Sequence, residues 1–155
     1  MRSLAFIGSP LGITDWANSV KEMIFQGINP FIPITQKQFE QEVDLLFVTP
    51  PTIPDSVKAE KVNDYIIRNR HYQQVWDIVN LYDDLLCKSE PPQLPTLIIW
   101  GTEDQIFDIS GSSRLQQCLA GSQLLQLPQA GHLLLIENAD AASAKYVNFL
   151  RTTTK

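Results

Sequence analysis

The sequence is short of cysteine, histidine and clustered basic residues, and each shortage excludes a class of function. Its two cysteines, Cys87 and Cys118, have no CxxC spacing and no His or Cys at metal-ligand intervals, so we expect small helix residues rather than a metal site. The 12 basic residues form no run and the net charge is -5. Because phosphates are neutralised by clustered Lys and Arg, we expect no nucleic-acid partner.

Long apolar runs are also absent. No segment approaches the roughly 20 apolar residues that span a bilayer, and the N-terminus lacks the charged, apolar and small-residue pattern of a signal peptide. The sequence therefore predicts no particular compartment. It does contain 44% hydrophobic and 19% charged residues over 155 positions, which is the composition of one ordinary globular domain.

Two strand-rich flanks enclose a long helical segment. Buried strands are predicted at residues 3–7, 96–100 and 123–127, and the segment between the first two has helical periodicity. A short helix is expected at 111–119, and a closing helix follows the last strand. This order implies parallel strands that are joined by crossover connections.

The helical segment shows recognisable starts and stops. Thr14 is a candidate N-cap for a first helix with Trp16 on its apolar face, and Gly27 ends that helix. Thr35 is expected to cap a second helix, and a third begins near Asp55. The residues predicted to face inward from the third and fourth helices are Val62, Tyr65, Ile66, Val75, Val79, Tyr82 and Leu86.

An acid and a histidine follow two of the predicted strands. Asp104 comes shortly after the strand that ends at Gly101, and His132 ends the loop after the next strand. In open parallel sheets chemistry is placed beyond the carboxyl ends of the strands, so the two side chains could meet there. Asp108 is instead interpreted as a residue that opens the following helix.

These residues carry a resemblance to a known family. The segment P-T-L-I-I-W-G-x-x-D, followed by a helix and then Q-L-L-x-L-P-x-A-G-H, resembles the C-terminal part of an α/β-hydrolase, and its continuation resembles the monoacylglycerol lipase and small-ester lipase branch. The resemblance implies an α/β fold with strands 6 to 8 of the family's parallel sheet. Residues 1–12 and 91–155 would form the core, and residues 13–90 an inserted all-helical cap.

The resemblance also implies roles for the acid and the histidine. Asp104 and His132 would be two members of a Ser-Asp-His triad, in which the acid orients the imidazole and the imidazole moves the proton. The serine is missing, because no G-x-S-x-G occurs in the sequence. We therefore expect the first five strands and the nucleophile to belong to a missing N-terminal half, and this chain alone to be inactive. No metal or organic cofactor is implied.

Apolar residues near the acid and the histidine suggest the substrate. In the family, the positions of Leu11, Ile106, Phe107 and Leu133 line an acyl pocket, although each could equally be ordinary packing. The expected substrate is a small-molecule or lipid-like carboxylic ester such as a monoacylglycerol. Peripheral contact with a membrane is compatible with such a substrate.

Two other classes of function are also compatible with the sequence. The same Asp and His would serve an epoxide hydrolase, a dehalogenase or a carbon-carbon bond hydrolase, and the residue in the upstream elbow would distinguish these reactions. Alternatively, the chain is a truncated fragment or a binding or structural protein without catalysis. Met1 stands directly before a strand, and that strand's apolar edge would then need another chain to cover it.

Overall fold

A three-stranded parallel sheet forms the centre of the computed structural model, which describes residues 2–9, 15–81, 90 and 93–153. The strands are β1 (Leu4–Ile7), β2 (Thr96–Gly101) and β3 (Gln123–Leu127), in the spatial order β1-β2-β3. Leu4 pairs with Thr96, and Ile99 pairs with Leu125. The strand predictions are confirmed, and the fold is of the α/β class, with a parallel sheet and flanking helices.

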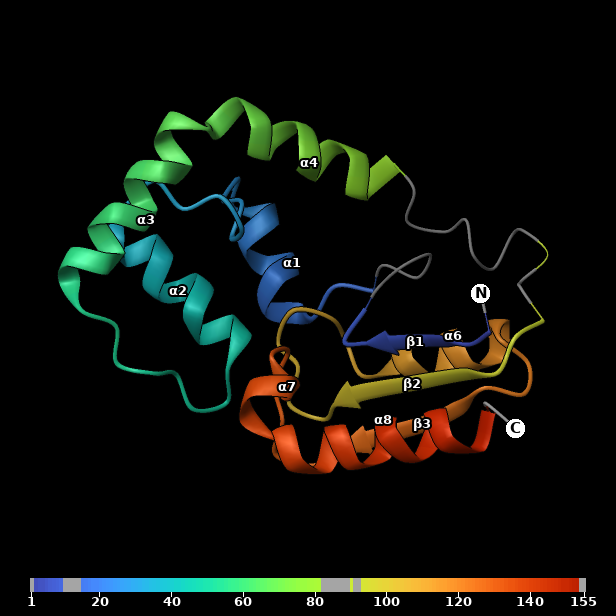
Figure 1. Ribbon diagram of the computed structural model, residues 1–155. Helices are drawn as coiled ribbons and strands as arrows, with labels where there is room; N and C mark the ends of the chain where they lie inside the picture. The colour runs from blue at the N-terminus through green and yellow to red at the C-terminus, as the bar shows by residue number, and fades with distance from the viewer. Residues whose placement is uncertain (1, 10–14, 82–89, 91–92, 154–155) are drawn as a thin grey trace.

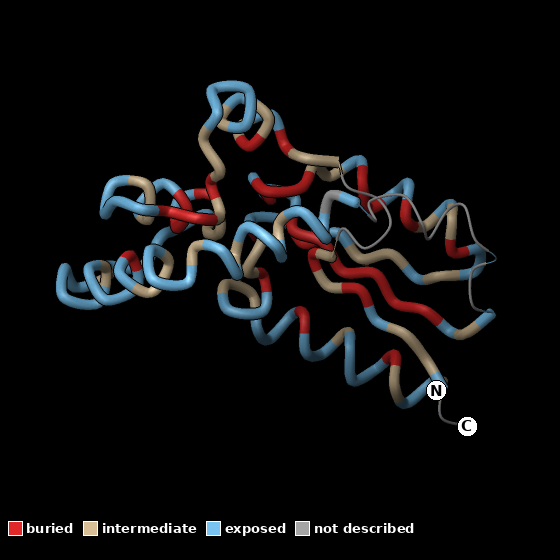
Figure 2. The backbone as a smooth tube through the Cα atoms, turned by 90° about the horizontal axis from the view of Figure 1, so that it is seen from above, coloured by how far each residue is buried: buried red, intermediate tan, exposed pale blue. Residues whose placement is uncertain are grey.

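The central strand β2 is buried along its whole length, because helices cover both of its faces (Figure 2). Side chains alternate between the faces of a strand. Ile98 and Trp100 therefore pack on one side, where α6 (Ser110–Cys118) contributes Leu115. Leu97 and Ile99 pack on the other side against α8 (Ala139–Thr153), and the short helix α7 (Leu134–Glu137) precedes α8 (Figure 1).

Four helices lie beyond the carboxyl ends of the strands, and we call them the helical block (Figure 1). They are α1 (Asn18–Phe25), α2 (Gln36–Leu46), α3 (Asp55–Ile67) and α4 (Asn69–Leu81). The Thr35 hydroxyl accepts a hydrogen bond from the Gln38 N–H at 3.2 Å, so the predicted cap is confirmed. The predicted start of the third helix at Asp55 is confirmed as well.

Other helix predictions are wrong. Trp16 precedes α1 and instead forms an isolated antiparallel bridge with Phe107. Ile66, Val75 and Val79 are exposed rather than packed inward, because an apolar stripe on a helix does not specify which part of the protein, if any, covers it. Thr14, Tyr82 and Leu86 lie outside the described residues.

The prediction for the cysteines is only partly correct. Cys118 is the last residue of α6 and packs beside the core, but it is disulfide-bonded rather than a plain helix residue. Cys87 lies outside the described residues. Among the helices that the structure describes, none has the length and apolar character required to cross a membrane.

The helical block contains one buried acid. Glu42 on α2 is only 8% exposed, and one of its carboxylate oxygens accepts a hydrogen bond from the Tyr65 hydroxyl at 3.0 Å. Its other oxygen, Oε2, has no hydrogen-bond partner within the described part of the chain. Burial disfavours the charged form and raises the pKa of Glu42 to about 7 from an ordinary 4.5.

This raised pKa predicts how stability changes with pH. The folded chain holds the Glu42 proton more tightly than the unfolded chain, so the stabilisation is complete below pH 4.5 and is lost as the pH rises toward about 7. The shift corresponds to an upper limit of about 3 kcal/mol in the free energy of unfolding. Urea unfolding between pH 4.5 and 8 should show that the free energy of unfolding falls less with rising pH in Glu42→Gln than in the unsubstituted chain. The exposed Glu60→Gln should keep the original pH dependence, and an unchanged slope in Glu42→Gln would contradict the prediction.

Candidate functional site

Asp104 is held rigidly in the loop that follows β2. Its Oδ1 accepts hydrogen bonds from the backbone N–H groups of Ile106 (2.9 Å) and Phe107 (3.1 Å). Its Oδ2 lies 3.1 Å from the Nδ1 of His132, and the carboxylate side chain is fully buried. Both oxygens are therefore used, and the orientation of the carboxylate is fixed before any ligand arrives.

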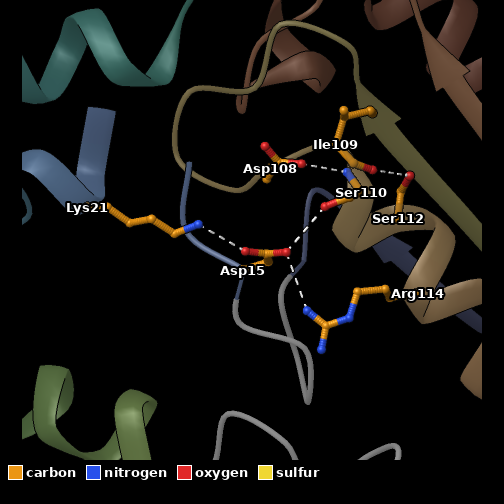
Figure 3. Close-up of polar contacts among 7 residues, drawn as sticks. All are labelled: Asp15, Lys21, Asp108, Ile109, Ser110, Ser112 and Arg114. Atoms are coloured by element: carbon orange, nitrogen blue, oxygen red, sulfur yellow. Dashed lines mark hydrogen bonds and ion pairs between the residues drawn. The ribbon is translucent and has the colours of Figure 1, made fainter. Parts of the chain in front are cut away.

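The neighbouring acids are directed elsewhere. Glu103 is exposed, whereas Asp108 accepts a hydrogen bond from the Ser110 N–H at 2.9 Å, just where α6 begins (Figure 3). The hydrogen bonds from the side chain and backbone of Ser110 lower the pKa of Asp108 below its usual value. Asp108 thus stabilises the start of α6, and the structure brings only Asp104 to His132.

The loop that carries His132 crosses directly over the end of β2. A Cβ on Gly101 would lie 2.2 Å from the carbonyl oxygen of Ala130, so only glycine permits this close approach. The Glu103 N–H also donates to the Ala130 carbonyl at 3.0 Å. Consequently the loop after β3 and the loop after β2 are joined where the acid and the histidine meet.

The end of β1 contributes to the same place. Gly8 has a φ of +54°, and a Cβ there would lie 3.3 Å from the carbonyl oxygen and 3.6 Å from the Nδ1 of His132. Its N–H donates to the Ile99 carbonyl at 2.9 Å. All three strands therefore end around this imidazole, whose side chain retains 22% exposure.

The segment before α1 is anchored to the loop that carries Asp104. The Asp15 carboxylate contacts Lys21, the Ser110 hydroxyl and Arg114 at 3.2 to 3.4 Å (Figure 3). Backbone hydrogen bonds run from Asp108 N–H to the Asp15 carbonyl and from Ala17 N–H to the Ile106 carbonyl. The start of the helical block is thus fixed beside the acid.

An apolar cavity of about 290 Å³ reaches the imidazole. Trp16 stacks on Phe107 with a ring distance of 4.8 Å, and the Phe107 ring lies 5.5 Å from that of His132. Residues that line the cavity come from the acid loop, from the segment before α1 and from the helical block. Among them are Trp16, Phe31, Leu46, Tyr72, Val75, Trp76, Val79, Ile106, Phe107 and His132.

The four predicted substrate-contacting residues fall in different places. Ile106 and Phe107 line the cavity. Leu133 is not among the lining residues, and its N–H donates to the Leu46 carbonyl at 3.0 Å. Leu11 lies outside the described residues. Trp76 carries no local sequence signal of a cavity residue, because only the packing of α4 against Trp16 brings it there.

The arrangement can perform a specific kind of chemistry. With its proton on Nδ1, His132 donates to Asp104 and leaves Nε2 free to accept a proton from a hydroxyl group. The buried carboxylate stabilises the imidazolium that results. Among the described residues, no group of three or more His, Cys, Asp and Glu side chains could hold a metal ion.

Comparisons with known proteins agree on the family. A family model described as the alpha/beta hydrolase fold matches residues 10–139. Monoacylglycerol lipase ABHD6 of Bos taurus is 29% identical over 124 residues, covering 78% of this chain and 37% of that protein. Lipase 3 of Moraxella sp. (strain TA144) is 25% identical over 126 residues, covering 78% of this chain and 39% of that lipase. The chain thus spans well under half of the curated relatives that it matches.

Solved structures show the same fold. A crystal structure of a membrane phospholipase A, described as a bacterial virulence factor, superposes with a TM-score of 0.82 at 22% identity. The superposition covers 97% of this chain and 49% of that one. The meta-cleavage product hydrolase CumD gives a TM-score of 0.70 at 19% identity, over 97% of this chain and 56% of the other. At these identities the likeness concerns the fold alone.

Proposed function

The chain belongs to the α/β-hydrolase family, and on that basis we propose that it supplies the acid and the histidine of a serine hydrolase that cleaves lipid-like carboxylic esters, such as monoacylglycerols. The observation that carries the proposal is the contact of 3.1 Å between Asp104 Oδ2 and His132 Nδ1, at the wall of an apolar cavity. Residues 1–12 and 91–155 would belong to the catalytic core, and residues 13–90 to its cap.

The reaction needs a serine from a segment upstream of these residues. His132 Nε2 takes the serine proton as the serine oxygen attacks the ester carbonyl carbon, and then gives that proton to the departing alcohol. A water molecule next loses a proton to His132 and attacks the acyl carbon. The carboxylic acid product leaves, and the serine recovers its proton from His132. Asp104 keeps the imidazole oriented and stabilises its charged form throughout.

The cavity supports an acyl chain as the bound group. Its walls are aromatic and aliphatic, so they would shield an apolar chain from water while offering few partners to an ionic group. Two relatives carry the names monoacylglycerol lipase and lipase. His132 is one of the residues that line the cavity, which would place an ester carbonyl within reach of the proton-transferring imidazole.

The proposal is tested on the complete protein, meaning the product of the whole reading frame that contains these residues. We expect one serine to react with a fluorophosphonate probe, and the protein to hydrolyse monoacylglycerols and p-nitrophenyl esters. The 155-residue chain by itself should show neither activity. Turnover of epoxides or haloalkanes without serine labelling, or no turnover at all, would contradict the proposal.

A cavity-filling substitution should change the preferred acyl length. Val75 lines the cavity and is 44% exposed, so Val75→Trp can occupy the cavity without overpacking the core. We expect kcat/KM for long-chain esters to fall at least about tenfold, with little change for acetyl esters. Val57→Trp is the matched control, because Val57 is 40% exposed on α3 and is not a lining residue. Equal losses for long and short esters would argue against an acyl pocket.

A further inference from the structure

Glu137, the last residue of α7, joins two distant segments through one carboxylate. Its Oε2 accepts a hydrogen bond of 2.7 Å from the Gly131 N–H, next to His132. Its Oε1 accepts hydrogen bonds from the backbone N–H groups of Val48 (2.7 Å) and Thr49 (3.1 Å), just after α2. The reaction steps described above assign no role to this acid.

A second contact ties the same two segments together. The Leu133 N–H donates to the Leu46 carbonyl at 3.0 Å. In addition, a Cβ on Gly131 would lie 3.1 Å from both the Leu46 carbonyl oxygen and the Val48 nitrogen. The residues on both sides of His132 are therefore held against residues 46–49, where α2 ends and the connection to α3 begins.

We propose that Glu137 is a positioning residue that sets the place of His132 and couples it to residues 46–49. Its carboxylate would hold the backbone of Gly131 in the position that lets the Nδ1 of His132 contact Asp104. A shift of residues 46–49 would move the same carboxylate and so disturb the contact between His132 and Asp104. The catalytic consequence rests on the proposed function, whereas the positioning itself does not.

The carboxylate of Glu137 makes hydrogen bonds that neither glutamine nor aspartate can reproduce in full. An ionised carboxylate accepts hydrogen bonds on both oxygens, and such charge-assisted bonds are stronger than neutral ones. In Glu137→Gln an NH₂ group replaces one carboxylate oxygen. Either the Gly131 N–H or the N–H groups of Val48 and Thr49 would then face a donor and lose their acceptor. Glu137→Asp retains both acceptors but is one methylene too short to reach Gly131 and Val48 together.

The positioning is measured by NMR on the ¹⁵N-labelled complete protein, with the His132 and His71 signals assigned by substituting each histidine in turn. In Glu137→Gln we expect the Nδ1–H signal of His132 to broaden or shift, and the Gly131 amide to exchange with solvent at least tenfold faster. The signals of His71 on α4 should not move. Glu103→Gln, which removes an exposed charge beside Asp104, should leave the His132 signals unchanged.

Several outcomes would overturn the inference. Unchanged His132 signals and unchanged Gly131 exchange in a folded Glu137→Gln chain would exclude the positioning role. Should Glu137→Gln fail to fold, Glu137→Asp gives the same readout. The unsubstituted chain adds a test of coupling, because the amides of Gly131, Val48 and Thr49 should open at one common rate. Independent opening rates would disprove the coupling.

Activity of the complete protein separates this inference from the proposed function. Glu137→Gln should lower kcat about tenfold to a hundredfold with an unchanged KM, because a small misplacement of a catalytic group has effects of that size. If the NMR changes occur but no ester is hydrolysed, the proposed function fails and the positioning role stands. If esters are hydrolysed and Glu137→Gln changes neither kcat nor the NMR signals, the positioning role fails alone.

Discussion

Replacing His132 with alanine in the complete protein should lower kcat for ester hydrolysis by about 10⁴-fold to 10⁶-fold, which is the effect of removing a triad member. The residual rate would come from the remaining groups that bind the substrate and stabilise the reacting oxygen. Steady-state kinetics with a p-nitrophenyl ester and a monoacylglycerol would measure the loss. KM should change far less than kcat, because the imidazole acts on the proton rather than on ground-state binding.

The fold should survive this substitution. The His132 side chain is partly exposed, and Asp104 keeps two backbone hydrogen bonds after the imidazole is gone. Thermal unfolding monitored by circular dichroism would verify this, and His132→Gln is the milder variant if alanine destabilises the chain. His71→Ala provides the matched control, since His71 is exposed on α4. A decrease in kcat of less than tenfold for His132→Ala would exclude its role as general base.

The parts of the fold that the sequence predicted well are those specified by local pattern. The segment Thr96–Trp100 between Pro95 and Gly101 is apolar or β-branched at every position, which predicts a strand that is buried on both faces. In the structure it forms the central strand. The proximity of Asp104 and His132 was predictable for a similar reason, because the loops that follow parallel strands lie at the same edge of the sheet. Their contact of 3.1 Å agrees with that expectation.

The parts that the sequence did not predict depend on packing between distant segments. Trp16 has the spacing of a helix residue, but pairing with Phe107 removes it from α1. Val75 and Val79 have the spacing of core residues, yet they face a cavity that only the arrangement of the helical block creates. Glu137 carries no local signal, since its partners at Val48 and Thr49 lie 89 and 88 residues away.

Replacing Asp104 with asparagine should lower kcat by about 10⁴-fold, as expected when the acid of a triad loses its charge. The amide group can no longer both accept the Nδ1 proton and hold a negative charge beside the imidazolium. Asparagine is preferred to alanine here, because its remaining oxygen can still accept the backbone hydrogen bonds from Ile106 and Phe107. Those two buried N–H groups would otherwise be unsatisfied, and the loop would be destabilised.

Asp108→Asn is the matched control, since it removes an equal charge from the same loop. The Asp108 carboxylate is directed toward Ser110 at the start of α6 (Figure 3), so we expect less than a tenfold change in kcat. The free energy of unfolding should fall by less than about 1 kcal/mol, because the asparagine oxygen can still accept the hydrogen bond from the Ser110 N–H and only the charge near the start of α6 is lost. Equal large losses of kcat at Asp104 and Asp108 would contradict the choice of acid. In that case the contact between Asp104 and His132 would be structural, and the proton-transferring pair would have to be sought elsewhere in the complete protein.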